Sequence, residues 1–215
     1  MKKFSSQTGA SVVEVLIVVA VLAILTTVAL VSYTSTRKYS ADEQARKIID
    51  VFDEARQKAL NQRKTFRVEI NRTKSELRLI DEGSNATTAN DDTILKKFQI
   101  SSLVVVGSAP PNVTGAPTAT TPINVPSYAS STYPLSNGEE KITLRFKRNG
   151  QVVDAGTDNV GTGSVMNGAT IYVYSRTPSV NSPDVIRAVT VLGTTGDTSL
   201  YKCTFTAGSC GNWSR

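Results

Sequence analysis

The N-terminal part of the chain begins with a long, almost uninterrupted apolar pattern. From Ala10 to Val31, 22 residues, the only polar side chains are those of Ser11, Glu14, Thr26 and Thr27. As an α-helix this stretch is about 33 Å long, which is enough to cross a bilayer core of about 30 Å. It contains no proline or glycine, so no residue in it breaks a helix. The pattern predicts a transmembrane helix over residues 10–31.

Residues 32–62 follow a different pattern, which is typical of an amphipathic helix. Apolar residues recur at spacings of three and four, and most other positions are charged. We therefore expect one helix from about Ser11 to Gln62, on the order of 75 Å long, whose second half packs on a domain core. The apolar stripe consists of Ile48, Ile49, Val51, Phe52, Ala55, Ala59 and Leu60.

Residues 63–215 carry the alternation expected of strands. Apolar residues alternate on both sides of a polar turn at residues 71–74, which predicts a hairpin. Asn149–Gly150 lies between two more alternating runs and is a strong hairpin signal. We expect seven or eight strands in a β-sandwich or two small packed antiparallel sheets, and hence an α+β fold. The other strand patterns lie in residues 94–107, 169–176, 184–196 and 199–205.

Residues 108–137 interrupt the strand patterns. They hold six of the eight prolines of the chain and almost no charge. Such a composition predicts an exposed, irregular excursion from the β domain. A surface insertion without a role, a variable binding loop and an O-glycosylated surface all remain open.

Composition argues against several classes of enzyme. The chain contains no histidine, which removes the commonest general base and the commonest metal ligand. No nucleophile with a base, phosphate-binding loop or metal-ligand cluster is visible, so we expect neither an enzyme nor a bound cofactor or metal. The net charge of +6 is spread along the chain and gives little support by itself for nucleic-acid binding.

The two cysteines, Cys203 and Cys210, lie close together near the C-terminus. Their spacing does not fit a redox or zinc motif of the Cys-x-x-Cys type. We expect a small disulfide loop, which would form in an oxidising compartment and stabilise the fold by roughly 2–3 kcal/mol. Two free thiols are the alternative.

The leader MKKFSSQTG and the residues after it resemble the class III signal of type IV prepilins. A short basic leader ends in Gly9, Ala10 follows, Glu14 is the fifth residue after the glycine, and about 20 apolar residues come next. The resemblance implies that a prepilin peptidase cuts after Gly9 and methylates the new amino terminus of Ala10. The chain departs from the commoner pattern in having Ala10 in place of Phe or Met. Position 31, where many major pilins carry a proline, is occupied by Val31.

Glu14 is the one charge inside the apolar pattern, where a carboxylate costs about 2.5–3.5 kcal/mol at mid-bilayer. After cleavage Glu14 would lie one helical turn from the amine of Ala10, so it could neutralise that amine or the amine of a neighbouring subunit. The carboxylate would then set the register in which subunits assemble. A carboxylate that reaches the lipid headgroups is the alternative.

The leader resemblance also implies a location and partners. Lys2 and Lys3 precede the apolar stretch while Arg37 and Lys38 follow it, so the charges leave its orientation ambiguous. The leader motif implies a single-pass inner-membrane protein with its C-terminal domain in the periplasm, in a filament located in the periplasm or at the cell surface. The implied partners are other pilins, the prepilin peptidase and the inner-membrane assembly platform.

The helix and the hairpin after it resemble the FimT/FimU and GspH-like minor pilins and pseudopilins. The family pattern LxxARxxAxxxxxxV is matched in part, and TLRFKRNGQVV resembles a later Phe-x-x-x-Gly strand pair. The resemblance implies a subunit at or near the tip of a type IV pilus or a type II secretion pseudopilus, where it primes assembly. It is carried by Phe52, Ala55, Arg56, Ala59 and Val68.

Some members of this group capture DNA through a Gly-Arg-x-Arg motif near the C-terminus. The comparable stretch here, residues 195–202, has no arginine, and Asp197 would repel phosphate. Arg187, Lys202 and Arg215 remain as scattered candidates for a salt-sensitive, sequence-independent contact. Three classes therefore compete: a structural filament subunit, a DNA-binding or adhesive tip pilin, and a membrane-anchored protein that never polymerises.

Overall fold

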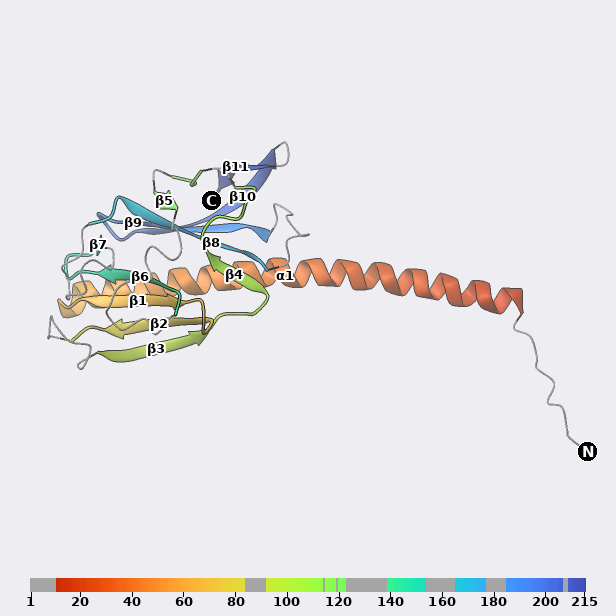
Figure 1. Cartoon of the computed structure of the whole chain (residues 1–215), viewed down its shortest axis with the longest axis horizontal. Helices are drawn as coiled ribbons and strands as arrows, with labels where there is room; N and C mark the ends of the chain where they lie inside the picture. Colours follow the sequence, from red (N-terminus) through yellow and green to blue (C-terminus); the bar gives the residue numbers. More distant parts are fainter. Residues whose placement is uncertain are drawn as a thin grey trace, which may run out of the picture. The chain divides into compact units, whose positions relative to one another are not determined.

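The helix predicted from the two hydrophobic patterns is α1, which begins at Val12 and ends at Gln62. The structure, a computed structural model, describes residues 11–83, 92–113, 115–118, 120–122, 139–153, 165–176, 185–206 and 209–215. The chain divides into two compact units, residues 1–36 and 37–215. The second unit contains the end of α1 and two sheets, which Figure 1 shows with their strand labels.

Sheet A has the strand order β3-β2-β1-β6-β7. The predicted hairpin at residues 71–74 is confirmed, because β1 and β2 pair antiparallel with Ile70 opposite Leu77. The Asn149–Gly150 hairpin joins β6 to β7, and Gly150 has a φ of 83° that favours glycine. The strands are β1 (Phe66–Asn71), β2 (Glu76–Asp81), β3 (Thr93–Gln99), β6 (Lys141–Phe146) and β7 (Val152–Val153).

Sheet B has the strand order β11-β10-β9-β8-β4, and β5 pairs with β8 outside this path. All neighbouring strands on the path are antiparallel, whereas the short β5 is parallel to β8. The strands are β4 (Val104–Gly107), β5 (Thr121–Pro122), β8 (Gly168–Ser175), β9 (Arg187–Leu192), β10 (Thr198–Thr206) and β11 (Ser209–Ser214).

The strand count from the sequence was too low, since the described residues alone form eleven strands. Residues 94–107 supply two strands that belong to different sheets, β3 and β4. The last strand, β11, was missed because its sequence SCGNWS has no alternation of apolar residues. In place of a loop after the final strand, Cys203 in β10 and Cys210 in β11 are joined across a hairpin, with 5.8 Å between their Cα atoms.

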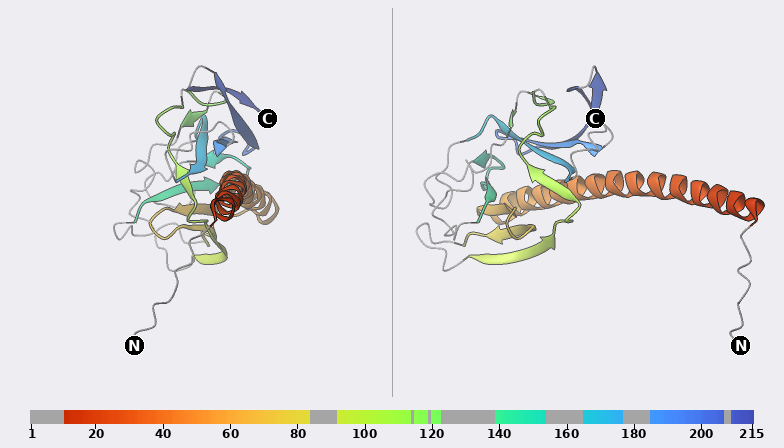
Figure 2. Two further views of the ribbon diagram at one scale, coloured as in Figure 1. Left: turned by 90° about the vertical axis from the view of Figure 1, so that its right-hand side faces the viewer. Right: turned by 45° about the vertical axis from the view of Figure 1, so that its right-hand side comes forward.

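The second half of α1 shares one hydrophobic core with both sheets. Its predicted apolar stripe is buried at Ile48, Val51 and Phe52, whereas Leu60 is 43% exposed and lies outside the core. The ring of Phe52 lies 5.7 Å from that of Phe146 in sheet A. Figure 2 shows this part of α1 beside the strands of both sheets. The long helix with two mainly antiparallel sheets confirms the α+β class.

The opposite face of sheet A holds an ionic cluster that period-two alternation did not predict. Arg67 donates hydrogen bonds to Glu69 (2.9 Å), Glu82 (2.6 Å) and Asp92 (2.6 Å). Arg145 donates to the same oxygen of Glu82 at 2.7 Å. Burial opposes the charge of Arg67, but the three carboxylates outweigh it and raise the pKa of Arg67. Strands β1 and β6 are therefore buried on both faces.

Candidate functional site

The first half of α1 exposes apolar side chains around its whole circumference. Their exposed fractions run from 49% at Val21 to 77% at Val12. A helix that is apolar on all sides needs an apolar environment, which can be a protein core, a bilayer or other helices. The exposed residues are Val12, Val13, Val15, Leu16, Ile17, Val18, Val19, Val21, Leu22, Ile24 and Leu25. We call these residues and Glu14 the apolar segment.

Glu14 is exposed in the first turn of α1, where the helix dipole favours a negative charge. Within the described residues its carboxylate makes no hydrogen bond or ion pair. The amide of Val15 donates to the carbonyl oxygen of Ser11 at 3.2 Å, which closes the first turn. Ser11 and Glu14 have the spacing of a capping box, but the side-chain hydrogen bonds of that motif are absent among the described residues. The predicted processing site, Gly9 and Ala10, lies outside the described residues.

Thr26, the polar residue farther along the same half of α1, is satisfied within the helix. Its hydroxyl lies 3.0 Å from the carbonyl oxygen of Leu22 and 2.9 Å from that of Ala23. The hydroxyl therefore needs no partner from outside the helix.

In the part of the chain that the structure describes, no helix is long and apolar enough to cross a membrane.

Arg187, one of the candidates for DNA contact, is buried, and this corrects its predicted role. Its side chain is 1% exposed and binds Asp42 of α1 with two hydrogen bonds, from Nε to Oδ1 and from Nη2 to Oδ2 at 3.1 Å. Burial by itself would raise the pKa of Asp42, but the hydrogen bond and the charge of Arg187 outweigh it and lower the pKa. The guanidinium thus holds β9 to α1 and cannot reach a phosphate.

Lys202 and Arg215, the other two candidates, are exposed at the same end of sheet B. Lys202 lies opposite Arg187 in β9 and opposite Ser214 in β11. Arg215 donates to the hydroxyl of Ser199 at 2.7 Å, and its guanidinium carbon lies 5.7 Å from the centre of the Tyr201 ring. The fold therefore brings the three predicted cations together, but leaves two of them accessible.

Arg56, which carries part of the family resemblance, joins α1 to two turns. Its Nη1 lies 3.0 Å from a carboxylate oxygen of Asp197. A Cβ added at Gly196 would lie 2.6 Å from the carbonyl oxygen of Gly150 and 3.1 Å from Cδ of Arg56. Gly196 also has a φ of 70°. Only glycine lets the two turns approach this closely over the helix, which gives the Arg56 position a structural role.

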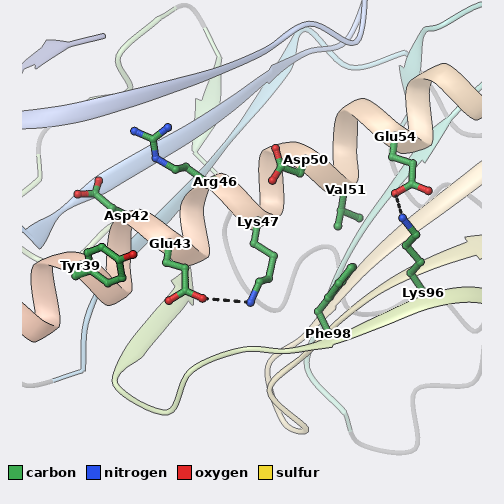
Figure 3. Close-up of a pocket in the computed structure, with 10 residues that line it drawn as sticks. All are labelled: Tyr39, Asp42, Glu43, Arg46, Lys47, Asp50, Val51, Glu54, Lys96 and Phe98. Carbon is green, nitrogen blue, oxygen red and sulfur yellow. Dashed lines mark hydrogen bonds and ion pairs between the residues drawn. The ribbon is translucent and has the colours of Figure 1, made fainter.

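A groove of about 440 Å³ runs between α1 and β3. Val51 and Phe98 form its apolar base, and an ion pair lies on either side (Figure 3): Glu43 with Lys47 at 3.6 Å, and Glu54 with Lys96 at 2.6 Å. These two pairs use four of the ionisable groups in the lining, and Asp42 is paired with Arg187. Among the residues described, no group of three or more Asp, Glu or Cys side chains could hold a metal ion. The lining residues are Tyr39, Asp42, Glu43, Arg46, Lys47, Asp50, Val51, Glu54, Lys96 and Phe98.

Comparison with known proteins adds one likeness. No family model and no curated protein matches the chain. A solved structure, that of the minor pseudopilin EpsH from the type 2 secretion system of Vibrio cholerae, is similar at 12% sequence identity and a TM-score of 0.45. The match covers 76% of this chain and 97% of that chain. Likeness at this level does not show a family.

Proposed function

We propose that this protein is a structural subunit of a filament of the type IV pilus or type II secretion pseudopilus class, assembled through the first half of α1. The observation that carries the proposal is the apolar segment. Its side chains are exposed on all sides of the helix and carry a single carboxylate, that of Glu14. Such a surface is stable only in lipid or among other apolar helices.

Glu14 has a defined task in this proposal. Cleavage after Gly9 gives Ala10 a free, N-methylated amine, which is cationic. Among apolar helices an unpaired carboxylate is costly, and removal of one partner from a buried ion pair costs about 3–5 kcal/mol. A subunit that docks with its amine beside Glu14 of a neighbour satisfies both charges. Other registers leave them unpaired and are disfavoured.

The proposed cellular setting follows from the leader and the apolar pattern in the sequence. Residues 10–31 anchor the subunit in the inner membrane, and residues 37–215 lie in the periplasm. The prepilin peptidase processes the chain and the assembly platform adds it to the filament. We place it with the minor subunits at or near the tip, where it primes assembly. A pilus and a secretion pseudopilus fit the residues equally well.

DNA capture at the tip has less support than a structural role. Arg187 is committed to Asp42, so the predicted basic contact retains only Lys202 and Arg215. The stronger competitor is a membrane-anchored protein that never polymerises. It uses the same apolar segment but needs neither cleavage after Gly9 nor the charge of Glu14.

The first test is the intact mass and N-terminal sequence of the protein from cells with and without prepilin peptidase. The proposal expects a chain that begins at methylated Ala10 only when the peptidase is present. A chain that begins at Met1 in both strains would reject the filament-subunit class and leave the membrane-anchored competitor.

The second test removes the charge of Glu14 and keeps the size of its side chain. Glu14→Gln is nearly isosteric and remains polar, so the main loss is the carboxylate charge. We expect at least a tenfold loss of the subunit from sheared filaments or from isolated pseudopili, with processing intact. Glu43→Gln is the matched control, because Glu43 is an exposed carboxylate of the same helix in the other unit. Normal incorporation of Glu14→Gln would show that assembly does not need the charge of Glu14.

A further inference from the structure

The beginning of the proline-rich excursion is not free of the β domain. We call its described residues 110–113, 115–118 and 120–122 the anchored segment. Val113 forms a parallel bridge to Cys210 in β11, and the amide of Cys210 donates to the carbonyl oxygen of Asn112 at 2.9 Å. Pro110 is buried. These contacts place the start of the segment along the outer edge of β11, the last strand of sheet B.

The disulfide lies directly beneath this attachment. Cys203 and Cys210 are buried in a small cluster with Ile186, separate from the main core. Val113 and Trp213 pack against the same cluster. Because Val113 touches the disulfide cluster by its side chain and β11 by its backbone, its position depends on how firmly β11 is held to β10.

A second contact continues the attachment toward the middle of sheet B. The hydroxyl of Tyr172 donates to the carbonyl oxygen of Gly115 at 3.0 Å, and the Tyr172 ring lies 5.9 Å from the ring of Trp213. Burial raises the pKa of Tyr172 to about 12, so this hydroxyl remains a donor at physiological pH. The middle of the segment is thus held by β8, with the ring of Tyr172 against a residue of β11.

The far end of the anchored segment is held without any help from β11. Thr120 hydrogen-bonds to Thr170 in β8, and β5 pairs with the same strand. Gly168 permits this approach, because a Cβ there would lie 2.6 Å from a methyl carbon of Thr120. The two ends therefore have different supports: the disulfide hairpin holds one end and a central strand holds the other.

We propose that the Cys203–Cys210 disulfide is a redox-sensitive anchor that seats residues 110–113 on sheet B. A dithiol reductant breaks the S–S bond by giving it two electrons and two protons, leaves two thiols, and becomes a disulfide itself. Without the bond, β11 is an edge strand of six residues whose one partner strand among those described is β10, across a register shift. Such an edge opens readily, and the bridge to Val113 opens with it. This inference is independent of filament assembly.

The test is amide hydrogen exchange of the full chain before and after treatment with dithiothreitol, read by mass spectrometry. Exchange at the amides of Asn112 and Val113 and of residues 209–214, above all at Cys210, whose amide donates to Asn112, should become about tenfold faster or more once the disulfide is lost. Residues 120–122 and the β1–β2 hairpin should change less than twofold. Trp213 is the only tryptophan, so its emission should shift to the red with the same time course.

Variants without the two cysteines test the same prediction independently of the reductant. Cys203→Ser with Cys210→Ser should reproduce the fast exchange at the amides of Asn112, Val113 and residue 210 without any reductant. Unchanged exchange there in a chain whose mass confirms reduction would overturn the proposal. Loss of protection throughout residues 37–215 would also overturn it, because the disulfide would then be a general staple.

Linkage supplies a reciprocal test. If the disulfide holds Val113, then Val113 must also hold the disulfide. Val113→Ala should make the disulfide reducible at a lower ratio of reduced to oxidised dithiothreitol. Val105→Ala is the matched control, since Val105 is half-buried in β4 at the opposite edge of sheet B. An equal effect of both variants would contradict the coupling.

Discussion

Residues 12–26 and residues 39–62 belong to the same helix, yet their apolar side chains have opposite environments. In the first region every large apolar side chain is about half exposed or more, on all sides of the helix. In the second region the apolar side chains form one stripe, and Ile48, Phe52 and Ala55 in it are at most 1% exposed. The first region has no described side chains covering it, whereas the second is covered by the two sheets.

The charged residues show the same difference. Glu14 makes no hydrogen bond or ion pair with a described residue, whereas several charges of the second region are paired inside the fold. Asp42 binds Arg187 of sheet B, and Glu54 binds Lys96 of sheet A. Even the fully buried Arg67 has carboxylates at hydrogen-bond distance. Among the described residues, Glu14 differs from these paired groups in being an unpaired charge among exposed apolar side chains, which supports the proposal that it needs a partner.

The largest expected effect comes from emptying the core beneath the second region. Phe52→Ala removes a ring that is 1% exposed and packs on Phe146, so we expect a loss of about 3–5 kcal/mol in the free energy of unfolding. Urea denaturation followed by Trp213 fluorescence would measure it. A loss below about 1 kcal/mol would mean that the stripe of α1 does not support the sheets as the structure has it.

A smaller loss is expected when the buried ionic cluster loses one charge. Glu82 accepts hydrogen bonds from both Arg67 and Arg145 through one oxygen. Glu82→Gln keeps the shape but leaves two buried guanidinium groups with less negative charge, at a cost of about 2–3 kcal/mol. The same denaturation experiment applies. Glu140→Gln serves as the control, because its pair with Arg72 is on the surface, and it should cost less than about 1 kcal/mol.

The Asp42–Arg187 pair should contribute less, and in a way that depends on pH. Because the folded-state pKa of Asp42 is below its usual value of 3.8, its ionisation stabilises the fold above that value. This stabilisation is lost as the pH falls through the folded-state pKa. Asp42→Asn should cost about 1–2 kcal/mol at pH 7, and the difference from the unaltered protein should shrink below about pH 4.

Unfolding curves between pH 3 and pH 7 would measure this dependence. Asp50→Asn is the matched control, because Asp50 is an exposed aspartate on the same helix, and it should cost less than about 0.5 kcal/mol at pH 7. A constant difference between Asp42→Asn and the unaltered protein down to pH 3 would show that Asp42 holds Arg187 without its charge.

The sequence predicted those parts of the fold in which apolar residues recur at a regular helix or strand spacing and are also buried. The helix end at Gln62 and the hairpin around residues 71–74 follow from such periods. It failed at β11, whose residues are polar or small because that strand is held by a disulfide and an edge pairing. It also failed at Arg67 and Arg145, because a charge buried beside distant carboxylates has the same local pattern as a charge in solvent.

The candidate site divides in the same way. The apolar half of α1 was predictable from its composition alone, because a long run of apolar residues without proline or glycine favours a helix that is apolar on all sides. The role of Arg187 was not predictable, since its partner Asp42 lies 145 positions away in the sequence. The anchoring of residues 110–113 likewise depends on contacts with a strand about a hundred residues later. The local pattern of apolar and polar residues indicates whether a segment is buried or exposed. It does not indicate which distant residue the segment contacts.

The smallest expected effect on stability comes from shortening one exposed leucine in each half of α1. Leu22 is 55% exposed in the first region and Leu60 is 43% exposed in the second. Leu22→Ala should change the free energy of unfolding of residues 37–215 by less than about 0.5 kcal/mol, because that unit does not depend on it. It should instead weaken binding of the full chain to lipid vesicles, since it removes exposed apolar surface. Leu60→Ala should lower the free energy of unfolding of residues 37–215 and leave vesicle binding unchanged, because Leu60 lies beside Gly150 in the turn of sheet A.

Urea denaturation and vesicle flotation of the same two variants would separate these effects. A leucine of similar exposure would then matter for stability in one half of the helix and for association in the other. If Leu22→Ala instead destabilised residues 37–215 by more than about 1 kcal/mol, the apolar segment would be packing on its own chain. Glu14 would then have an intramolecular environment, and an assembly role for its charge would lose its main support.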